Sequence, residues 1–171
     1  HYPEMIFIGE VYDPNQYRMY VESGFDYLYD KVGMYDCIRG VICGERSASS
    51  ITHEWQKVDD IRDHMLYFLE NHDEQRIASD FFAGNPWKGV PVMIVSALLQ
   101  QNPVMVYAGQ EFGERGMDKE GFSGQDGRST IFDYWTSDAI YKGFFNRDAL
   151  TTDEKKLSLI YQGLLRFCNR E

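Results

Sequence analysis

Four short apolar runs along the chain predict its strands. They lie at residues 5–11 (MIFIGEV), 25–29 (FDYLY), 65–69 (MLYFL) and 103–107 (PVMVY). Each run is too short for an ordinary helix and is rich in residues that favour β-structure. Because the first run is apolar at nearly every position, we expect it to be buried on both faces of a sheet.

Between these runs, apolar positions recur at helical spacing. The longer predicted helices cover residues 31–43, 49–63, 74–82 and 90–100. Pro14 is expected to open a short helix after a turn, and Ser50 is the expected N-cap of the helix near residue 49. Five glycines within residues 113–127 predict a loop. A Thr-x-x-Glu capping box at residues 151–154 predicts a last helix that runs to Cys168.

Strands that alternate with helices indicate an α/β fold with parallel strands. About four βα units are expected, which is half of an eight-fold (β/α)8 TIM-type barrel; a small open sheet is the other arrangement that the pattern allows. Ligands of such folds bind at the carboxyl ends of the strands. The polar residues at those ends are Glu10, Asp30, Asn71 with Asp73, and Gln110 with Glu111. No GxGxxG or Walker pattern follows a strand, so nucleotide binding is not expected.

Composition narrows the classes of partner. The formal net charge of −10 argues against a nucleic acid, and no apolar stretch reaches the roughly 18–20 residues of a membrane helix. Aromatic residues make up 15% of the chain, which suits a sugar site but equally suits an aromatic-rich core. The three cysteines, Cys37, Cys43 and Cys168, lack the spacing of zinc or redox sites and are expected to be incidental thiols. Nothing in the sequence indicates a cellular compartment.

Two segments place a carboxylate where a predicted strand ends. FIGEVYD contains Glu10, and FLENHDEQR contains Asp73. Glycosidic hydrolysis needs a protonated acid at the leaving oxygen and negative charge near an oxocarbenium-like transition state. A Glu in a partly apolar site keeps its proton near neutral pH, and Gly9 is expected to leave space for a ligand beside Glu10.

Residue type alone leaves other roles open for these side chains. Glu10 could also form an ion pair with a nearby basic side chain, and Asp73 could cap a helix that starts at Glu74. A lone His72 would more often be a structural histidine. Glu70 is close to Asp73 in sequence, and we interpret it as supporting structure because strand alternation points it elsewhere.

Both segments resemble signature regions of glycoside hydrolase family 13, the α-amylase family. Glu10 matches the family's general acid/base at the end of the fifth barrel strand, and Asn71-His72-Asp73 matches the NHD motif after the seventh. The resemblance implies that Asp73 stabilises the transition state and that His72 binds sugar hydroxyls. NPVMVYAGQEFG resembles the eighth-strand segment, with Gln110 where the family often has Asp. GRSTIFDYW and the last helix resemble the end of the barrel, so the resemblance spans nearly the whole chain.

The family's nucleophilic Asp, in a motif like GFRxDxAxxxP, has no counterpart in this sequence. Residues 1–171 are therefore expected to be the C-terminal half of a catalytic barrel, without the N-terminal half and the β-domain that usually follows. The parent enzyme is expected to be a retaining glycoside hydrolase or transglycosylase acting on the α-glucosidic bonds of starch-like oligosaccharides. The isolated chain is expected to be inactive.

Further residues have roles that the sequence leaves open. Glu111 is expected either to contact substrate or to orient the barrel mouth, and Tyr12 to stack on a sugar; Tyr107 and Trp135 suit stacking or a core equally. Asp118, Glu120 and Asp126 do not match the EF-hand spacing and are expected to form a solvated loop. No metal site and no cofactor is predicted, although a structural calcium in the parent enzyme is compatible with the resemblance.

A second hypothesis comes from a different class of function. A half-barrel leaves strand edges and an apolar face unpaired, and both favour association. The chain is then a non-catalytic module that binds carbohydrate or associates with itself, with a C2-symmetric homodimer as the expected assembly.

Overall fold

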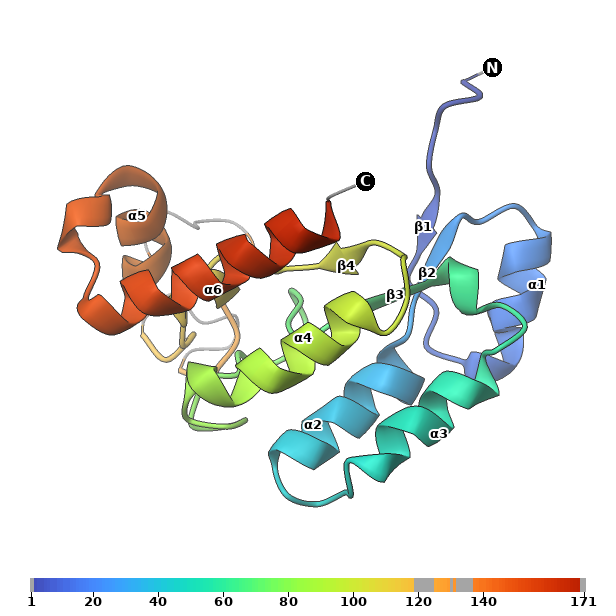
Figure 1. The fold of residues 1–171 in the computed structure, drawn as a ribbon, viewed down its shortest axis with the longest axis horizontal. Helices are drawn as coiled ribbons and strands as arrows, with labels where there is room; N and C mark the ends of the chain where they lie inside the picture. Colours follow the sequence, from blue (N-terminus) through green and yellow to red (C-terminus); the bar gives the residue numbers. More distant parts are fainter. Residues whose placement is uncertain (1, 119–124, 130, 132–136, 170–171) are drawn as a thin grey trace. The chain divides into compact units, whose positions relative to one another are not determined.

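Four parallel strands form the sheet at the centre of the fold. They are β1 (Ile8–Gly9), β2 (Tyr27–Tyr29), β3 (Met65–Phe68) and β4 (Val104–Met105). They are neighbours in chain order, β1-β2-β3-β4, with Gly9 opposite Leu28 and Leu28 opposite Met65 (Figure 1). Parallel strands in chain order with helices between them confirm the predicted α/β class and are the arrangement of half a (β/α)8 barrel.

The computed structural model describes residues 2–118, 125–129, 131 and 137–169. The chain divides into two compact units. The first contains residues 1–68 and 96–105, and with them the whole sheet; the second contains residues 69–95 and 106–171. No helix within the described residues is long and apolar enough to span a membrane.

The helices of the first unit follow the predicted order. Pro14 opens a 3₁₀ turn, and α1 (Tyr17–Glu22) continues from it. A π-helical turn (Lys31–Tyr35) leads into α2 (Asp36–Ile42), which packs beside α3 (Ser49–Lys57) (Figure 1).

The sheet side chains form the core of the first unit. Leu28, Met65 and Phe68 are buried, and the Tyr35 ring stacks on Phe68 with centroids 5.0 Å apart. Gln100, before β4, donates a hydrogen bond to the carbonyl oxygen of Met65 and so ties the start of β3 to the segment that leads into β4.

The second unit contains most of the remaining helical structure. α4 (Val90–Leu98) begins here, with Pro91 in its first turn, and ends in the first unit. α5 (Asp138–Phe145) was not predicted from the sequence. α6 (Thr152–Cys168) begins with the predicted capping box, in which the Thr151 hydroxyl accepts from the Glu154 amide and the Glu154 carboxylate accepts from the Thr151 amide. Its apolar stripe buries Leu157 and Tyr161.

The prediction of a first strand buried on both faces is wrong. β1 contains two residues, and Met5, Ile6, Phe7 and Ile8 are at least half exposed. β1 is at the end of the strand order, and among the residues that the structure describes it pairs with β2 alone, so the apolar run has a neighbouring strand on one side only.

Two predicted helical features also differ. α3 begins at Ser49 and ends at Lys57 rather than near residue 63, and its N-cap is Ala48 instead of Ser50. No helix forms over residues 74–82, which are turns. There the amide of Arg76 donates to the carbonyl of Gly127, and the amide of Ile77 donates to the Glu70 carboxylate. In a helix that starts at Glu74, the Ile77 amide would make the first i−4 hydrogen bond, and the Glu70 carboxylate accepts that hydrogen instead.

Candidate functional site

Glu10 and Tyr12 lie immediately after β1 in the first unit. Both side chains are exposed, and the Tyr12 hydroxyl donates a hydrogen bond to Glu10 Oε1 at 2.5 Å. This contact orients an accessible carboxylate at the carboxyl end of a parallel strand, which is where α/β folds bind ligands. The geometry suits both the predicted acid/base role of Glu10 and a contact between substrate and Tyr12.

Gly9 has a different role from the one expected. A Cβ atom at this position would lie 2.9 Å from side-chain atoms of both Leu28 and Phe25. The glycine is therefore required by packing on β2 and the residues before it, and space for a ligand beside Glu10 is not needed to explain it.

Asp30 follows β2 and is almost fully buried. Its Oδ1 accepts hydrogen bonds from the Gly33 amide at 3.1 Å and from the Tyr17 hydroxyl at 3.3 Å. Burial raises the pKa of the Asp30 carboxyl to about 6, although hydrogen bonds from the Met34 amide, the Tyr17 hydroxyl and the Gly33 amide oppose the shift. From the sequence, Asp30 was predicted to be a polar residue at the end of a strand. In the structure its side chain is buried in the core of the first unit.

The raised pKa of Asp30 predicts a dependence of stability on pH. The folded pKa of about 6 lies above the unfolded value, so the folded state retains a proton that the unfolded state releases. This contribution to stability is fully present at low pH and is lost as pH rises through about 6. Asp30→Asn removes it while keeping an acceptor for Gly33, so stability of the variant relative to wild type should rise by about 2–3 kcal/mol between pH 4 and 7.

Urea unfolding of both proteins at several pH values measures this difference. Asp63→Asn, which changes an exposed carboxyl in the same unit, is the matched control and should show little pH-dependent difference from wild type. A constant difference between Asp30→Asn and wild type from pH 4 to 7 would show that the Asp30 pKa is ordinary.

Asn71, His72 and Asp73 form a tight turn in the second unit, just after the chain leaves β3. Asn71 is buried, and its Oδ1 accepts hydrogen bonds from the amides of Asp73 at 2.9 Å and Glu74 at 2.8 Å. Asn71 therefore shapes the turn. Since residues 74–82 are not helical, the alternative role of Asp73 as a helix cap is wrong.

The side chains of His72 and Asp73 face solvent together. Asp73 Oδ2 is 3.6 Å from His72 Nε2, and about half of each side chain is exposed. A carboxylate and an imidazole presented side by side on a turn can both reach the hydroxyl groups of a polar ligand. The side chains of His72, predicted to bind sugar, and of Asp73, predicted to stabilise charge, are thus accessible. The side chain of Asn71, which was predicted to contact substrate, is buried.

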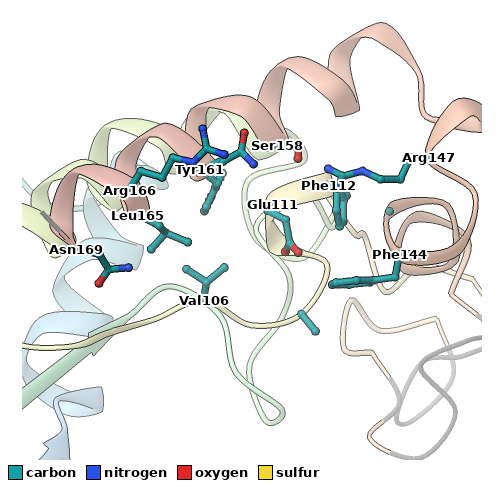
Figure 2. Close-up of a pocket in the computed structure, with 13 residues that line it drawn as sticks. Val106, Glu111, Phe112, Phe144, Arg147, Ser158, Tyr161, Leu165, Arg166 and Asn169 are labelled. Carbon is teal, nitrogen blue, oxygen red and sulfur yellow. The ribbon is translucent and has the colours of Figure 1, made fainter.

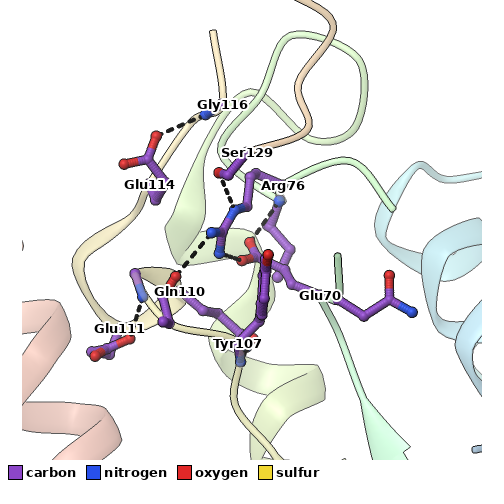
Figure 3. Close-up of polar contacts among 12 residues, drawn as sticks. Glu70, Arg76, Tyr107, Gln110, Glu111, Glu114, Gly116 and Ser129 are labelled. Carbon is purple, nitrogen blue, oxygen red and sulfur yellow. Dashed lines mark hydrogen bonds and ion pairs between the residues drawn. The ribbon is translucent and has the colours of Figure 1, made fainter. Parts of the chain in front are cut away.

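A buried ion pair lies beneath this turn. Arg76 and Glu70 are 0% and 2% exposed, and Arg76 Nη1 is 2.8 Å from Glu70 Oε2 (Figure 3). Burial raises the pKa of the Glu70 carboxyl, while the Arg76 guanidinium and the Ile77 amide oppose that shift. Glu70 thus supports the structure, in line with its interpretation from the sequence.

Arg76 has a buried structural role that was not predicted from the sequence. The segment FLENHDEQR does have opposite charges on either side of the NHD motif, Glu70 before it and Arg76 after it, and this spacing is compatible with an ion pair. The partners of Arg76 other than Glu70 are distant in sequence, so the pattern alone does not show that the arginine is buried.

Glu111 lines a cavity of about 540 Å³ in the second unit. Its Oε2 accepts a hydrogen bond from the Gly109 amide at 3.0 Å, and burial raises the pKa of its carboxyl. Phe112, Phe144 and Arg147 lie around it, with Tyr161 of α6 also lining the cavity (Figure 2). This geometry favours an orienting role for Glu111 at the segment after β4; its contact with substrate stays a prediction.

Two of the three residues considered for calcium, Asp118 and Asp126, lie within the described part of the chain. Asp126 is paired with Arg128, whose Nη2 lies 2.6 Å from Asp126 Oδ2, so its carboxylate already has a cationic partner. Asp118 is exposed, and Glu120 lies outside the described residues. Of the aromatic candidates, Tyr107 packs against the Arg76 guanidinium, 4.1 Å from the ring centroid, and Trp135 lies outside the described residues.

Comparison with known proteins connects the fold to one enzyme. The chain is similar in structure to the α-amylase from H. orenii, with a TM-score of 0.59 and 18% sequence identity over 93% of this chain. The chain spans 36% of the length of that α-amylase. No family model and no curated protein sequence matches the chain. The two proteins therefore share a fold over nearly all of this chain.

Proposed function

From this shared fold and the positions of its carboxylates, we propose that the chain is part of a retaining glycoside hydrolase of the α-amylase family. The enzyme acts on α-glucosidic bonds of starch-like oligosaccharides. Glu10 protonates the glycosidic oxygen and then activates water, and Asp73 stabilises the charged transition state. His72 positions the sugar. The nucleophilic Asp comes from a part of the enzyme outside these 171 residues.

The observation that carries the proposal is where the two motifs lie on the fold. Glu10 directly follows β1, and the His72–Asp73 turn follows β3, so each motif leaves a parallel strand at its carboxyl end. Barrel enzymes take catalytic residues from the ends of several strands at that face. Both carboxylates are accessible in their own units, as groups that contact substrate must be.

Glu10→Gln in the full-length protein encoded by the gene tests the proposal. An amide cannot protonate the sugar hydroxyl that leaves when an unactivated maltooligosaccharide is cleaved, so kcat/KM on that substrate should fall by about 10²-fold or more. α-Maltosyl fluoride needs little protonation of its leaving group, so its kcat/KM, which reports the first step alone, should fall far less. Its kcat should still fall, because Glu10 also activates the water of the second step. Steady-state kinetics on the two substrates give the ratio that identifies an acid catalyst.

Glu22→Gln is the matched control, because Glu22 is an exposed carboxylate at the end of α1 in the same unit. Its activity on both substrates should equal that of wild type. Equal activity of Glu10→Gln and wild type on the maltooligosaccharide would overturn the proposal. The non-catalytic, self-associating half-barrel would then be favoured, since Met5, Ile6, Phe7 and Ile8 expose an apolar segment beside β1, which among the described residues pairs on one side only.

A further inference from the structure

Arg76 joins three segments of the second unit that are distant in sequence. Its Nη1 donates to Glu70, its Nη2 to the Ala108 carbonyl at 2.8 Å, and its Nε to Ser129 Oγ at 2.8 Å (Figure 3). Every nitrogen of the guanidinium therefore has an acceptor on a different segment. The fixed planar fork of arginine can make these three contacts at once, whereas a lysine ammonium is a single donor centre.

The backbone of the turn that carries His72 and Asp73 is held from both of its ends. At the near end, Asn71 Oδ1 accepts from the amides of Asp73 and Glu74. At the far end, the Ile77 amide donates to Glu70 Oε1, so one carboxylate binds both the Arg76 side chain and the Ile77 backbone. With these contacts the conformation of the turn no longer depends on helical hydrogen bonds.

Gly127 brings a further segment against the same turn. The Arg76 amide donates to the Gly127 carbonyl at 2.7 Å, and Gly127 has φ of +83°. A Cβ atom there would lie 2.7 Å from Ser79 Oγ, so both the backbone conformation and the close approach require glycine. Residues 127–129 thus contact the turn through the backbone of Gly127 and the side chain of Ser129.

We propose that Arg76, anchored by Glu70 and Ser129, is a positioning residue that holds His72 and Asp73 in their reactive arrangement. This inference rests on the proposed function, in which those two side chains contact the substrate. Arg76 is fully buried and acts on the reaction only through the turn. Because misplacement of a catalytic group by about 1 Å can cost 10²-fold in rate, small movements of the turn should be visible in kcat.

The test uses Arg76→Lys and the milder Ser129→Ala, with two readouts. Hydrogen exchange of the amides of Asp73 and Glu74 should accelerate by about 10-fold in Arg76→Lys, and by less in Ser129→Ala, because the turn opens locally. In the full-length enzyme, kcat should fall by about 10- to 10²-fold in Arg76→Lys with KM nearly unchanged. Ser129→Ala should give an intermediate kcat.

Leu157→Ala separates positioning from general loss of stability. Leu157 is buried in α6, and its truncation weakens the unit without touching the turn. It should leave local exchange at Asp73 and Glu74, and kcat of the folded enzyme, unchanged. Unchanged exchange in both Arg76→Lys and Ser129→Ala would overturn the inference whatever the activity. Faster exchange in an enzyme whose Glu10→Gln variant stays fully active would instead count against the proposed function.

Discussion

Arg76→Met should lower the free energy of unfolding by about 3–5 kcal/mol, because it leaves the Glu70 carboxylate buried without its charged partner. Glu70 is 2% exposed, and water cannot replace the lost guanidinium. The Ala108 carbonyl and Ser129 hydroxyl also lose their donors. Urea unfolding followed by circular dichroism measures the change. A loss of this size is a large share of the stability of an ordinary domain.

An exposed ion pair in the same unit is the matched control. Arg115 Nη2 lies 3.0 Å from Asp80 Oδ1, with more than half of each side chain exposed. Arg115→Met should therefore cost less than about 1 kcal/mol. Equal losses for the Arg76 and Arg115 variants would contradict a buried, charged Glu70–Arg76 pair.

The double variant Glu70→Met with Arg76→Met extends the test. Removing both charges abolishes the uncompensated carboxylate, so the double variant should recover part of the stability lost by Arg76→Met alone. Recovery should be incomplete, because the Ile77 amide and the Ala108 carbonyl still lack the partners that the ion pair provided.

The positions of the strands were predictable from the sequence, and their extent was not. All four strands lie within the predicted runs, since short β-rich runs between helical patterns have few other structures. The runs at residues 5–11 and 103–107 have a similar composition to the others, but only Ile8–Gly9 and Val104–Met105 are in strand. Whether a run has neighbours on both sides depends on its place in the sheet, which local sequence does not encode.

The missed features depend on contacts between distant residues. The helix predicted over residues 74–82 has suitable spacing, yet Glu70 accepts the Ile77 amide hydrogen that the first i−4 bond of this helix would use. Arg76 binds residues 32 and 53 positions away. By contrast, Glu10 and the NHD turn were identifiable because their position at strand ends is itself a local pattern.

Asp73→Asn should lower kcat of the full-length enzyme by about 10³-fold, the cost of removing a preorganised group aimed at charge that develops in the transition state. Asparagine preserves the size of the side chain and the turn made by Asn71, so KM should change little. Steady-state kinetics on the unactivated maltooligosaccharide measure the loss. Asp80→Asn, an exposed carboxylate in the same unit, should retain wild-type activity.

The choice of leaving group distinguishes the role of Asp73 from that of Glu10. Stabilisation of an oxocarbenium-like transition state is needed whichever group departs, so Asp73→Asn should lose as much kcat/KM on α-maltosyl fluoride as on the maltooligosaccharide. In Glu10→Gln, kcat/KM should be largely spared on the fluoride. If kcat/KM of Asp73→Asn were also spared on the fluoride, Asp73 would be assisting departure of the leaving group rather than stabilising the charge on the sugar ring.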